Sequence, residues 1–129
     1  QRSDATLTEL AAAHEHLRFF ASLSDGALVR EVCRYMTLLR LAPGEVVFDM
    51  GDPSSCFYVV RVGAVRVSRV DRETRADLMT LAQLNEGDAF GELGLLQQAP
   101  RAGRVTAVDE AELLVLRERD YLRRLYQRQ

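Results

Sequence analysis

Short β-rich segments alternate with turn signals from Pro43 and Gly44 to about Leu116, and this alternation restricts the fold more than any other feature. Branched and aromatic residues fill the segments, while glycine, proline, asparagine and aspartate separate them, as expected of strands and turns. We expect strands at residues 46–48, 57–62, 64–70, 78–84, 105–108 and 112–116, and a charged hairpin tip at 71–75. This spacing predicts a mainly β domain, an antiparallel β-roll or jelly roll of about eight strands.

Helical patterns flank the β region on both sides. Residues at helical spacing begin the chain, at Leu7, Leu10, Ala11, His14, Leu17 and Phe20. A second helix is expected after a cap at Ser24 or Asp25, with an inner stripe of Ala27, Leu28, Val32, Cys33 and Met36. We therefore expect one domain over residues 1–129, with N-terminal helices in 1–40, the β region in 41–116 and a C-terminal helix in 117–129. In that last helix we expect Arg123 and Arg124 on a solvent-exposed face.

The length and the charge of the chain limit the kinds of molecule that it is expected to bind. The chain has 129 residues, enough for one hydrophobic core, and a formal net charge of -2. All 17 basic residues are arginines scattered along the sequence, so there is no electrostatic reason to expect nucleic acid or anionic lipid as a partner. No apolar run has membrane-spanning length, so we expect no direct membrane insertion. The chain begins at Gln1 and ends within a helical pattern, so we expect it to be part of a longer protein.

The cysteine content indicates the redox environment. Two cysteines, Cys33 and Cys56, are too few for the disulfide framework of a small secreted domain. We expect two buried free thiols in a reducing compartment, either the cytoplasm or the cytoplasmic side of a membrane protein. A single disulfide between the two cysteines stays open as the alternative.

The segment FGELGLLQQAPRAGR, residues 90–104, carries the most specific chemistry. Strands are expected on both sides of it, which leaves residues 91–98 for one or two helical turns that begin near Glu92. A helix start exposes unpaired N–H groups and attracts anions, and Gly91 and Gly94 allow a ligand to approach the backbone closely. Pro100 is expected to end the helix, so that Arg101 can return to the same anion in a bidentate pair.

Glu92 indicates a second kind of ligand group. A carboxylate repels phosphate but accepts hydrogen bonds from sugar hydroxyls. Phosphate and sugar hydroxyl in one pocket imply a nucleotide or a sugar phosphate. The alternative is structural: Glu92 would only favour the helix start electrostatically, and Arg101 would pair with a surface acid.

The surrounding residues add a family resemblance. FGELGL followed by PRAGRV resembles the phosphate-binding cassette of cyclic nucleotide-binding domains, with the cassette at residues 90–104. The resemblance extends in order and spacing to PGEVVF, MGD, FYVV and RVGAVRV in the β region, and upstream to LRFFASLSDGALVREV. Downstream, LRERDYLRRL resembles the first C-terminal helix in regulatory subunits of cyclic AMP-dependent protein kinase. The similarity covers the chain from about Leu17 to Leu125.

The resemblance implies a role for each cassette residue. Glu92 would accept a hydrogen bond from the ribose 2′-hydroxyl, and Arg101 would pair with an exocyclic oxygen of the cyclic phosphate. Leu93 would be the apolar hinge contact that passes the movement of the cassette to the C-terminal helix. Backbone N–H groups near Gly91, Glu92, Gly94 and Ala102 would complete the phosphate cradle.

Departures from the family pattern concern selectivity and the accessory residues. Family members that recognise guanine often have threonine or serine after the phosphate arginine, so Ala102 favours cyclic AMP over cyclic GMP. Arg104 replaces a threonine, and we expect it to point to solvent or pair with a surface acid rather than add a phosphate contact. Ser55 replaces an aspartate that holds the phosphate arginine. Further accessory candidates are Gly103 and Tyr126, whose ring could stack on adenine.

The function implied by the resemblance is a regulatory module rather than an enzyme. His14 and His16 face different sides of a helix, and no histidine cluster lies in the β region, which counts against a metalloenzyme. We expect a cyclic AMP sensor that needs no cofactor or metal and acts on an attached or partner effector through its C-terminal helix. The alternative is a domain of the same fold that does not respond to cyclic nucleotides, and instead binds a protein or another nucleoside or phosphate. The sequence does not choose the effector.

Overall fold

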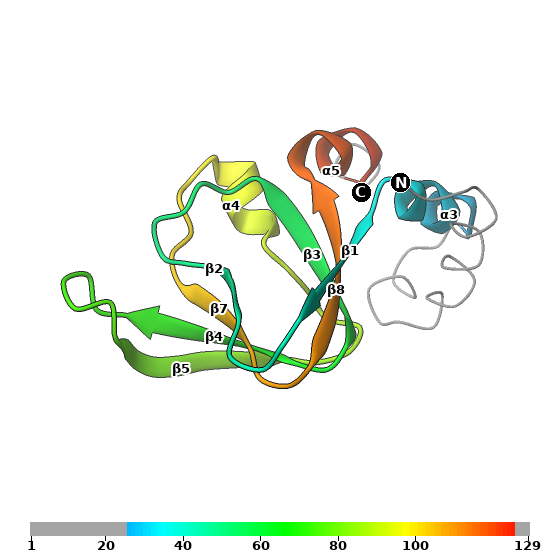
Figure 1. The fold of residues 1–129 in the computed structure, drawn as a ribbon. Coiled ribbons are helices and arrows are strands. Elements are labelled where there is room, and N and C mark those ends of the chain that lie inside the picture. The colour runs from blue at the N-terminus through cyan, green and yellow to red at the C-terminus, as the bar shows by residue number, and fades with distance from the viewer. Residues whose placement is uncertain (1–25, 126–129) are drawn as a thin grey trace.

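The computed structural model describes residues 26–125, which form eight strands and three helices (Figure 1). The strands are β1 (Thr37–Leu41), β2 (Val46–Phe48), β3 (Cys56–Val62), β4 (Val65–Val70), β5 (Asp77–Leu84), β6 (Ala89–Phe90), β7 (Arg104–Ala107) and β8 (Ala111–Arg117). The helices are α3 (Gly26–Arg34), α4 (Glu92–Gln97) and α5 (Glu118–Arg124).

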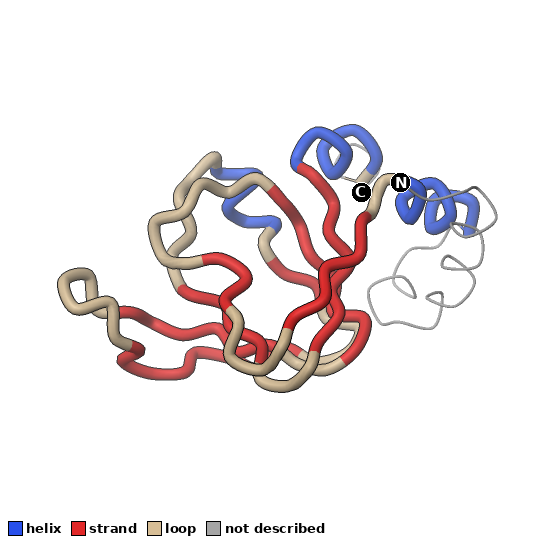
Figure 2. Tube along the Cα trace, in the orientation of Figure 1, coloured by secondary structure: helices blue, strands red, loops and turns tan. Residues whose placement is uncertain are grey.

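The strands form two four-stranded sheets, with orders β1-β8-β3-β6 and β2-β7-β4-β5. Every strand pair is antiparallel, which confirms the predicted β-roll with flanking helices. Figure 2 shows α3 and α5 close to each other at one end of the roll, with the β4–β5 hairpin extending away from them at the other. Helix α4 lies between the last strand of one sheet, β6, and the second strand of the other, β7.

Strands β3 and β8 carry two separate hydrophobic cores on their opposite faces. Side chains alternate across a strand, so successive residues reach different faces of the sheet. Phe57, Val59, Leu114 and Leu116 belong to the core shared with α3 and α5. Tyr58, Val60 and Leu113 belong to the core that includes Val65 and Val105 from the other sheet. Burial on both faces explains why FYVV and LLVL are almost continuously apolar.

The boundary of the N-terminal helical region differs from the prediction. We expected helix up to residue 40, whereas α3 ends at Arg34 and residues Thr37–Leu41 form strand β1. The strand forms because TLLRL pairs along its whole length with β8, from Thr37 opposite Val115 to Leu41 opposite Ala111. A short apolar run is compatible with helix or strand, and here the long-range pairing decides.

The inner face of α3 is mostly as predicted. Leu28, Val32 and Cys33 are buried, and so is Met36, which lies two positions after the end of the helix. Ala27 is exposed, and Val29 is buried in its place. Strand β6, only two residues long, was also not predicted. The helix expected around Leu7 to Phe20 and the caps Ser24 and Asp25 lie outside the described residues.

Helix α5 packs against β3 and α3. The Tyr121 ring lies 4.9 Å from the Phe57 ring, and Leu125 is fully buried. The expectation that Arg124 is on a solvated face is wrong, because its Nη1 donates to Glu31 of α3 at 2.8 Å. Its guanidinium also lies 3.6 Å from the centre of the Tyr35 ring. One arginine therefore connects the helices that precede and follow the roll.

Replacing Arg124 with methionine should lower the free energy of unfolding by about 1 kcal/mol, because the ion pair and the cation–π contact are both lost while the apolar stem is kept. Urea denaturation followed by circular dichroism measures this change. Arg123, the exposed neighbour, provides the matched control, and Arg123→Met should leave the unfolding midpoint unchanged. Equal effects of the two substitutions would contradict a specific α3–α5 contact.

The two cysteines are both unbridged, Cys33 buried and Cys56 half-buried. The expected burial therefore holds for Cys33 and is only partial for Cys56. Within residues 26–125, the helices are too short or too polar to cross a membrane.

Candidate ligand-binding site

A pocket of about 470 Å³ opens between α4 and the second sheet. It is lined by residues 89–94 and 99–103 and by Phe48, Val67, Leu84, Gln97 and Val105. Pockets of this size hold small-molecule ligands, and most of this lining is apolar. The residues predicted from the cassette therefore surround one cavity: Gly91, Glu92, Leu93, Gly94, Arg101 and Ala102, together with the accessory candidate Gly103.

The backbone of the cassette takes the predicted course. Gly91 precedes the helix in the left-handed conformation, with φ 97°, and α4 begins at Glu92. Pro100 was expected to end the helix, but α4 already ends at Gln97. Gln98 adopts a left-handed conformation, and the Ala99 N–H donates to the Gly94 carbonyl at 3.1 Å. The chain then continues through Pro100 to Arg101, which lines the same pocket as the helix.

Arg101 is the central charged group of the site. It is only 6% exposed, and its Nη1 and Nη2 donate to the carbonyls of Gly91 at 2.8 Å and Cys56 at 2.6 Å. The guanidinium lies 4.2 Å from the centre of the Phe48 ring. Its Nε is buried without a hydrogen-bond partner. This geometry excludes the alternative that Arg101 pairs with a surface acid.

The charge of Arg101 is not neutralised within the described part of the chain. Its acceptors are neutral carbonyls, and between residues 26 and 125 no carboxylate forms an ion pair with it. Desolvation lowers the pKa of Arg101 from its usual value. A buried cation of this kind favours an anionic ligand, which would supply the missing charge and accept from N–H groups that the two carbonyls leave unused.

The main chain of Arg101 is also fixed. Its N–H donates to the Asp52 carbonyl at 2.8 Å, and its carbonyl accepts from the Gly51 N–H at 2.8 Å. These two bonds attach the arginine to the turn formed by residues 49–52. Within that turn, the Asp49 N–H donates to the Asp52 carboxylate at 2.9 Å, so the turn is ordered by its own side chains.

Glu92 and its neighbours form the other side of the pocket. Glu92 is half-buried, and its carboxylate has no hydrogen bond or ion pair with any residue that the structure describes. Gly94 lies so close to Ser54 that an added Cβ would collide with the Ser54 Oγ. Leu93 is 65% exposed at the pocket. The site thus combines a buried cation with a free carboxylate acceptor.

The family model described as "Cyclic nucleotide-binding domain" matches residues 38–129, which is more than half of the chain. This chain belongs to the cyclic nucleotide-binding domain family. The match includes the whole pocket and confirms the resemblance carried by the cassette and the β segments.

Relatives of this cyclic nucleotide-binding domain include regulators of two kinds. The chain is 39% identical over 84 residues to the cyclic AMP receptor protein of Thermus thermophilus, covering 64% of this chain and 38% of that protein. It is 34% identical over 122 residues to a cAMP-dependent protein kinase regulatory subunit of Blastocladiella emersonii, covering 88% of this chain and 30% of that protein. The chain therefore spans about a third of the length of these relatives.

Solved structures show the same fold. The regulatory subunit of a cAMP-independent protein kinase A from Trypanosoma cruzi, bound to guanosine, superimposes with a TM-score of 0.84 at 19% identity. The match covers 96% of this chain and 44% of that chain. At this level of identity the likeness concerns the fold alone.

Of the accessory candidates of the domain, Ser55 forms no hydrogen bond with Arg101, and Tyr126 lies outside the described residues. Ser55 is exposed, and the one hydrogen bond of its hydroxyl that the structure gives is a weak one to the Cys56 Sγ at 3.9 Å. The acceptor for Arg101 is the main-chain carbonyl of the next residue, Cys56. A backbone acceptor has no side-chain signature, so the sequence could not reveal it.

Arg104 does not line the pocket. Its Nε and Nη1 donate to Asp49 and Asp77, each at 3.0 Å, and its Nη2 donates to the Arg75 carbonyl at 2.8 Å. Of the two expectations for this residue, pairing with surface acids is the one observed.

The two aspartates that bind Arg104 are ionised at neutral pH. The pKa of Asp49 is lowered from 3.8 chiefly by the hydrogen bond from Arg104, and that of Asp77 by the hydrogen bond from Ser68 and by the charge of Arg104. A lowered pKa means that the stabilisation is present above pH 3.8 and is lost as the pH falls through the folded-state values.

Proposed function

We propose that this cyclic nucleotide-binding domain is a cyclic AMP sensor that regulates an attached or partner effector. The observation that carries the proposal is that one pocket holds both Arg101, a buried cation, and Glu92, a carboxylate, and that neither has an ion-pair partner among residues 26–125. Arg101 would bind an exocyclic oxygen of the cyclic phosphate, and Glu92 would accept from the ribose 2′-hydroxyl. Backbone N–H groups at Gly91, Glu92, Gly94 and Ala102 would complete the cradle.

The choice of base rests on Ala102. Its methyl group lines the pocket and offers no hydroxyl to guanine, and Val67 and Leu84 add apolar wall. Without a hydroxyl at position 102, guanine would lose the hydrogen bond that this position could otherwise supply, which favours adenine. Cyclic GMP is therefore the weaker ligand in this proposal.

The signal would pass from the pocket to α5. Leu93 is exposed on α4, and α5 contacts β3 beside Phe57, so movement of the cassette would change the surface on which the C-terminal helix packs. Cyclic AMP would favour whichever arrangement binds it better, which is a population shift. The domain would regulate without catalysis, cofactor or metal, in the cytoplasm, and the rest of the protein would determine the effector.

A second candidate is a domain that does not respond to cyclic nucleotides. Ser55 supplies no carboxylate to Arg101, whose Nη atoms already bind two carbonyls. The guanosine-bound Trypanosoma cruzi subunit belongs to a kinase whose name states independence of cAMP. Under this candidate the pocket would take a nucleoside or another phosphate, or serve only as a scaffold for a protein partner.

Isothermal titration calorimetry with cyclic AMP, cyclic GMP, guanosine and 5′-AMP separates these candidates. We expect the strongest binding for cyclic AMP. Cyclic GMP has the same sugar and phosphate, so its weaker binding would report the preference for adenine over guanine. Stronger binding of guanosine than of cyclic AMP would support the second candidate. Absence of heat and of a thermal shift with either cyclic nucleotide at millimolar concentration would exclude the first.

A further inference from the structure

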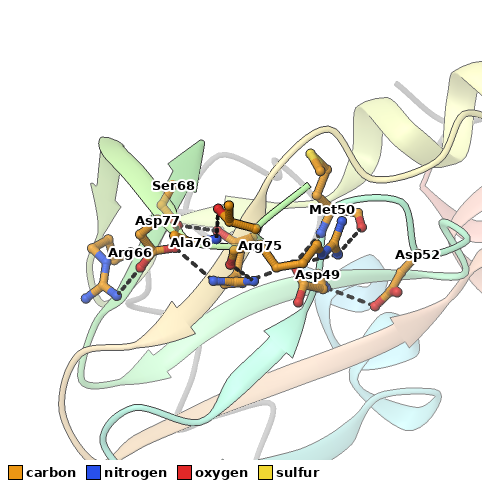
Figure 3. Close-up of polar contacts among 10 residues, drawn as sticks. Asp49, Met50, Asp52, Arg66, Ser68, Arg75, Ala76 and Asp77 are labelled. Carbon is orange, nitrogen blue, oxygen red and sulfur yellow. Dashed lines mark hydrogen bonds and ion pairs between the residues drawn. The ribbon is translucent and has the colours of Figure 1, made fainter. Parts of the chain in front are cut away.

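Arg104 connects three segments that are far apart in the sequence. It begins β7, and its side chain is 16% exposed. Its Nε, Nη1 and Nη2 each donate a hydrogen bond. The acceptors are Asp49 in the turn after β2, and Asp77 and the Arg75 carbonyl in the β4–β5 hairpin. Figure 3 shows Asp49 beside Met50 and Asp52 of the turn, and Asp77 beside Ser68 on the side of the hairpin. Three of its five N–H donors are therefore engaged by the turn and the hairpin, and Arg104 is not among the residues that line the pocket.

The turn that receives Arg104 is the turn that holds Arg101. Arg75 strengthens this attachment, because its Nη2 donates to the Met50 carbonyl at 2.9 Å and lies 3.4 Å from Asp49. The N–H of Gly51 and the carbonyl of Asp52 then bind the main chain of Arg101. The side chain of Arg104 and the main chain of Arg101, the proposed phosphate arginine, are thus both hydrogen-bonded to the same turn of four residues.

The hairpin that receives Arg104 carries the opposite wall of the pocket. Asp77 also accepts from Ser68 at 3.1 Å and from Arg66 at 3.3 Å, so the start of β5 is bonded to β4 through side chains. The β4–β5 ladder has two register irregularities, which weaken its backbone pairing locally. Val67 and Leu84 of this hairpin line the pocket.

We propose that Arg104 is a positioning residue for nucleotide binding, which holds Arg101 and the β4–β5 wall in place before the ligand arrives and does not itself contact the ligand. The proposal rests on the proposed function for the identity of the ligand. Ion pairs near the surface contribute little to global stability, so the main effect of Arg104 is expected in binding. Preorganisation of this kind raises affinity because less ordering is needed on binding.

The test is a double-mutant cycle of Arg104→Gln and Asp49→Asn, with cyclic AMP affinity measured by calorimetry. If Arg104 acts by positioning, each single substitution weakens binding by about three- to tenfold, and the double variant is little worse than either, because both break one network. Arg69→Gln on the exposed face of β4 is the matched control and should bind as the parent does. The melting temperatures of the variants should stay close to that of the parent.

Contrary outcomes are distinct. If Arg104 contacted the phosphate directly, Asp49→Asn would free the Arg104 side chain for that contact. Cyclic AMP would then bind Asp49→Asn as tightly as the parent, or more tightly, while it bound Arg104→Gln weakly. This result would overturn the proposal. Equal affinity of Arg104→Gln and the parent would also overturn it.

A ligand-free measurement separates this proposal from the proposed function. The amide hydrogens of Gly51 and Arg101 report the two bonds between the turn and Arg101, and NMR hydrogen exchange measures their opening. In Arg104→Gln they should exchange about tenfold faster, while the Val59 amide in the core of β3 exchanges as in the parent. If the parent bound no cyclic AMP, the proposed function would fail, and unchanged exchange would still refute positioning by Arg104.

Discussion

Replacing Arg101 with lysine should weaken cyclic AMP binding by about 100-fold, the largest effect that we expect from any single substitution. Removing one partner of a buried, hydrogen-bonded charge pair costs about 2 to 5 kcal/mol, and 100-fold corresponds to about 2.7 kcal/mol. Lysine keeps the charge but cannot donate to the Gly91 and Cys56 carbonyls and to a phosphate oxygen in one planar geometry. Calorimetric titration with cyclic AMP measures the loss.

The control for Arg101→Lys is Arg69→Lys, the same chemical change on the exposed face of β4. It should leave the dissociation constant unchanged. Arg101 also orders the cassette, so thermal unfolding must be measured on both variants to separate loss of affinity from loss of fold. A folded Arg101→Lys protein that binds cyclic AMP as tightly as the parent would refute the bidentate role of Arg101.

Replacing Gly91 with alanine should reduce cyclic AMP affinity at least about tenfold and lower stability by about 1 to 3 kcal/mol. The residue has φ 97°, where an L side chain is strained. A Cβ there would also lie 3.1 Å from the Cys56 carbonyl and 3.2 Å from the Arg101 Nη1. The added methyl group therefore presses on one acceptor of Arg101 and on the guanidinium itself. Urea denaturation and calorimetry measure the two effects.

Gly44→Ala provides a matched control for this strain. Gly44 has φ 88°, and an added Cβ would have no heavy atom within 4 Å. It should therefore destabilise the domain through backbone strain while leaving the affinity for cyclic AMP unchanged. If the two variants lost the same affinity, the contact of Gly91 with the Arg101 network would have no role in binding.

The strands and the pocket segment were predictable because their signals are local. Phe57 to Val62 read as a buried strand between a turn and Gly63, and the structure adds only Cys56 to it. The start of α4 at Glu92 followed from two glycines and a proline within a short insertion. The clustering of Glu92 and Arg101 required the family pattern as well, because spacing alone left a structural alternative open.

Long-range pairing accounts for what the sequence did not reveal. Strand β1 depends on β8, whose paired residues lie 70 to 78 positions later in the sequence, so TLLRL was predicted to be the end of a helical region. Arg124 was expected in solvent because its partners, Glu31 in α3 and Tyr35 directly after it, lie about ninety positions earlier in the sequence. The Cys56 carbonyl leaves no side-chain signal at all.

The cassette joins β6 of one sheet to β7 of the other, and this connection ties occupancy of the pocket to the unfolding equilibrium. An unfolded chain, in which the sheets have separated, has no pocket, so a ligand binds only the folded protein. Free ligand at one hundred times its dissociation constant then adds about 2.7 kcal/mol to the free energy of unfolding by mass action. The ligand concentration in the cell would in this way influence how fast proteases degrade the whole domain, as well as its signalling state.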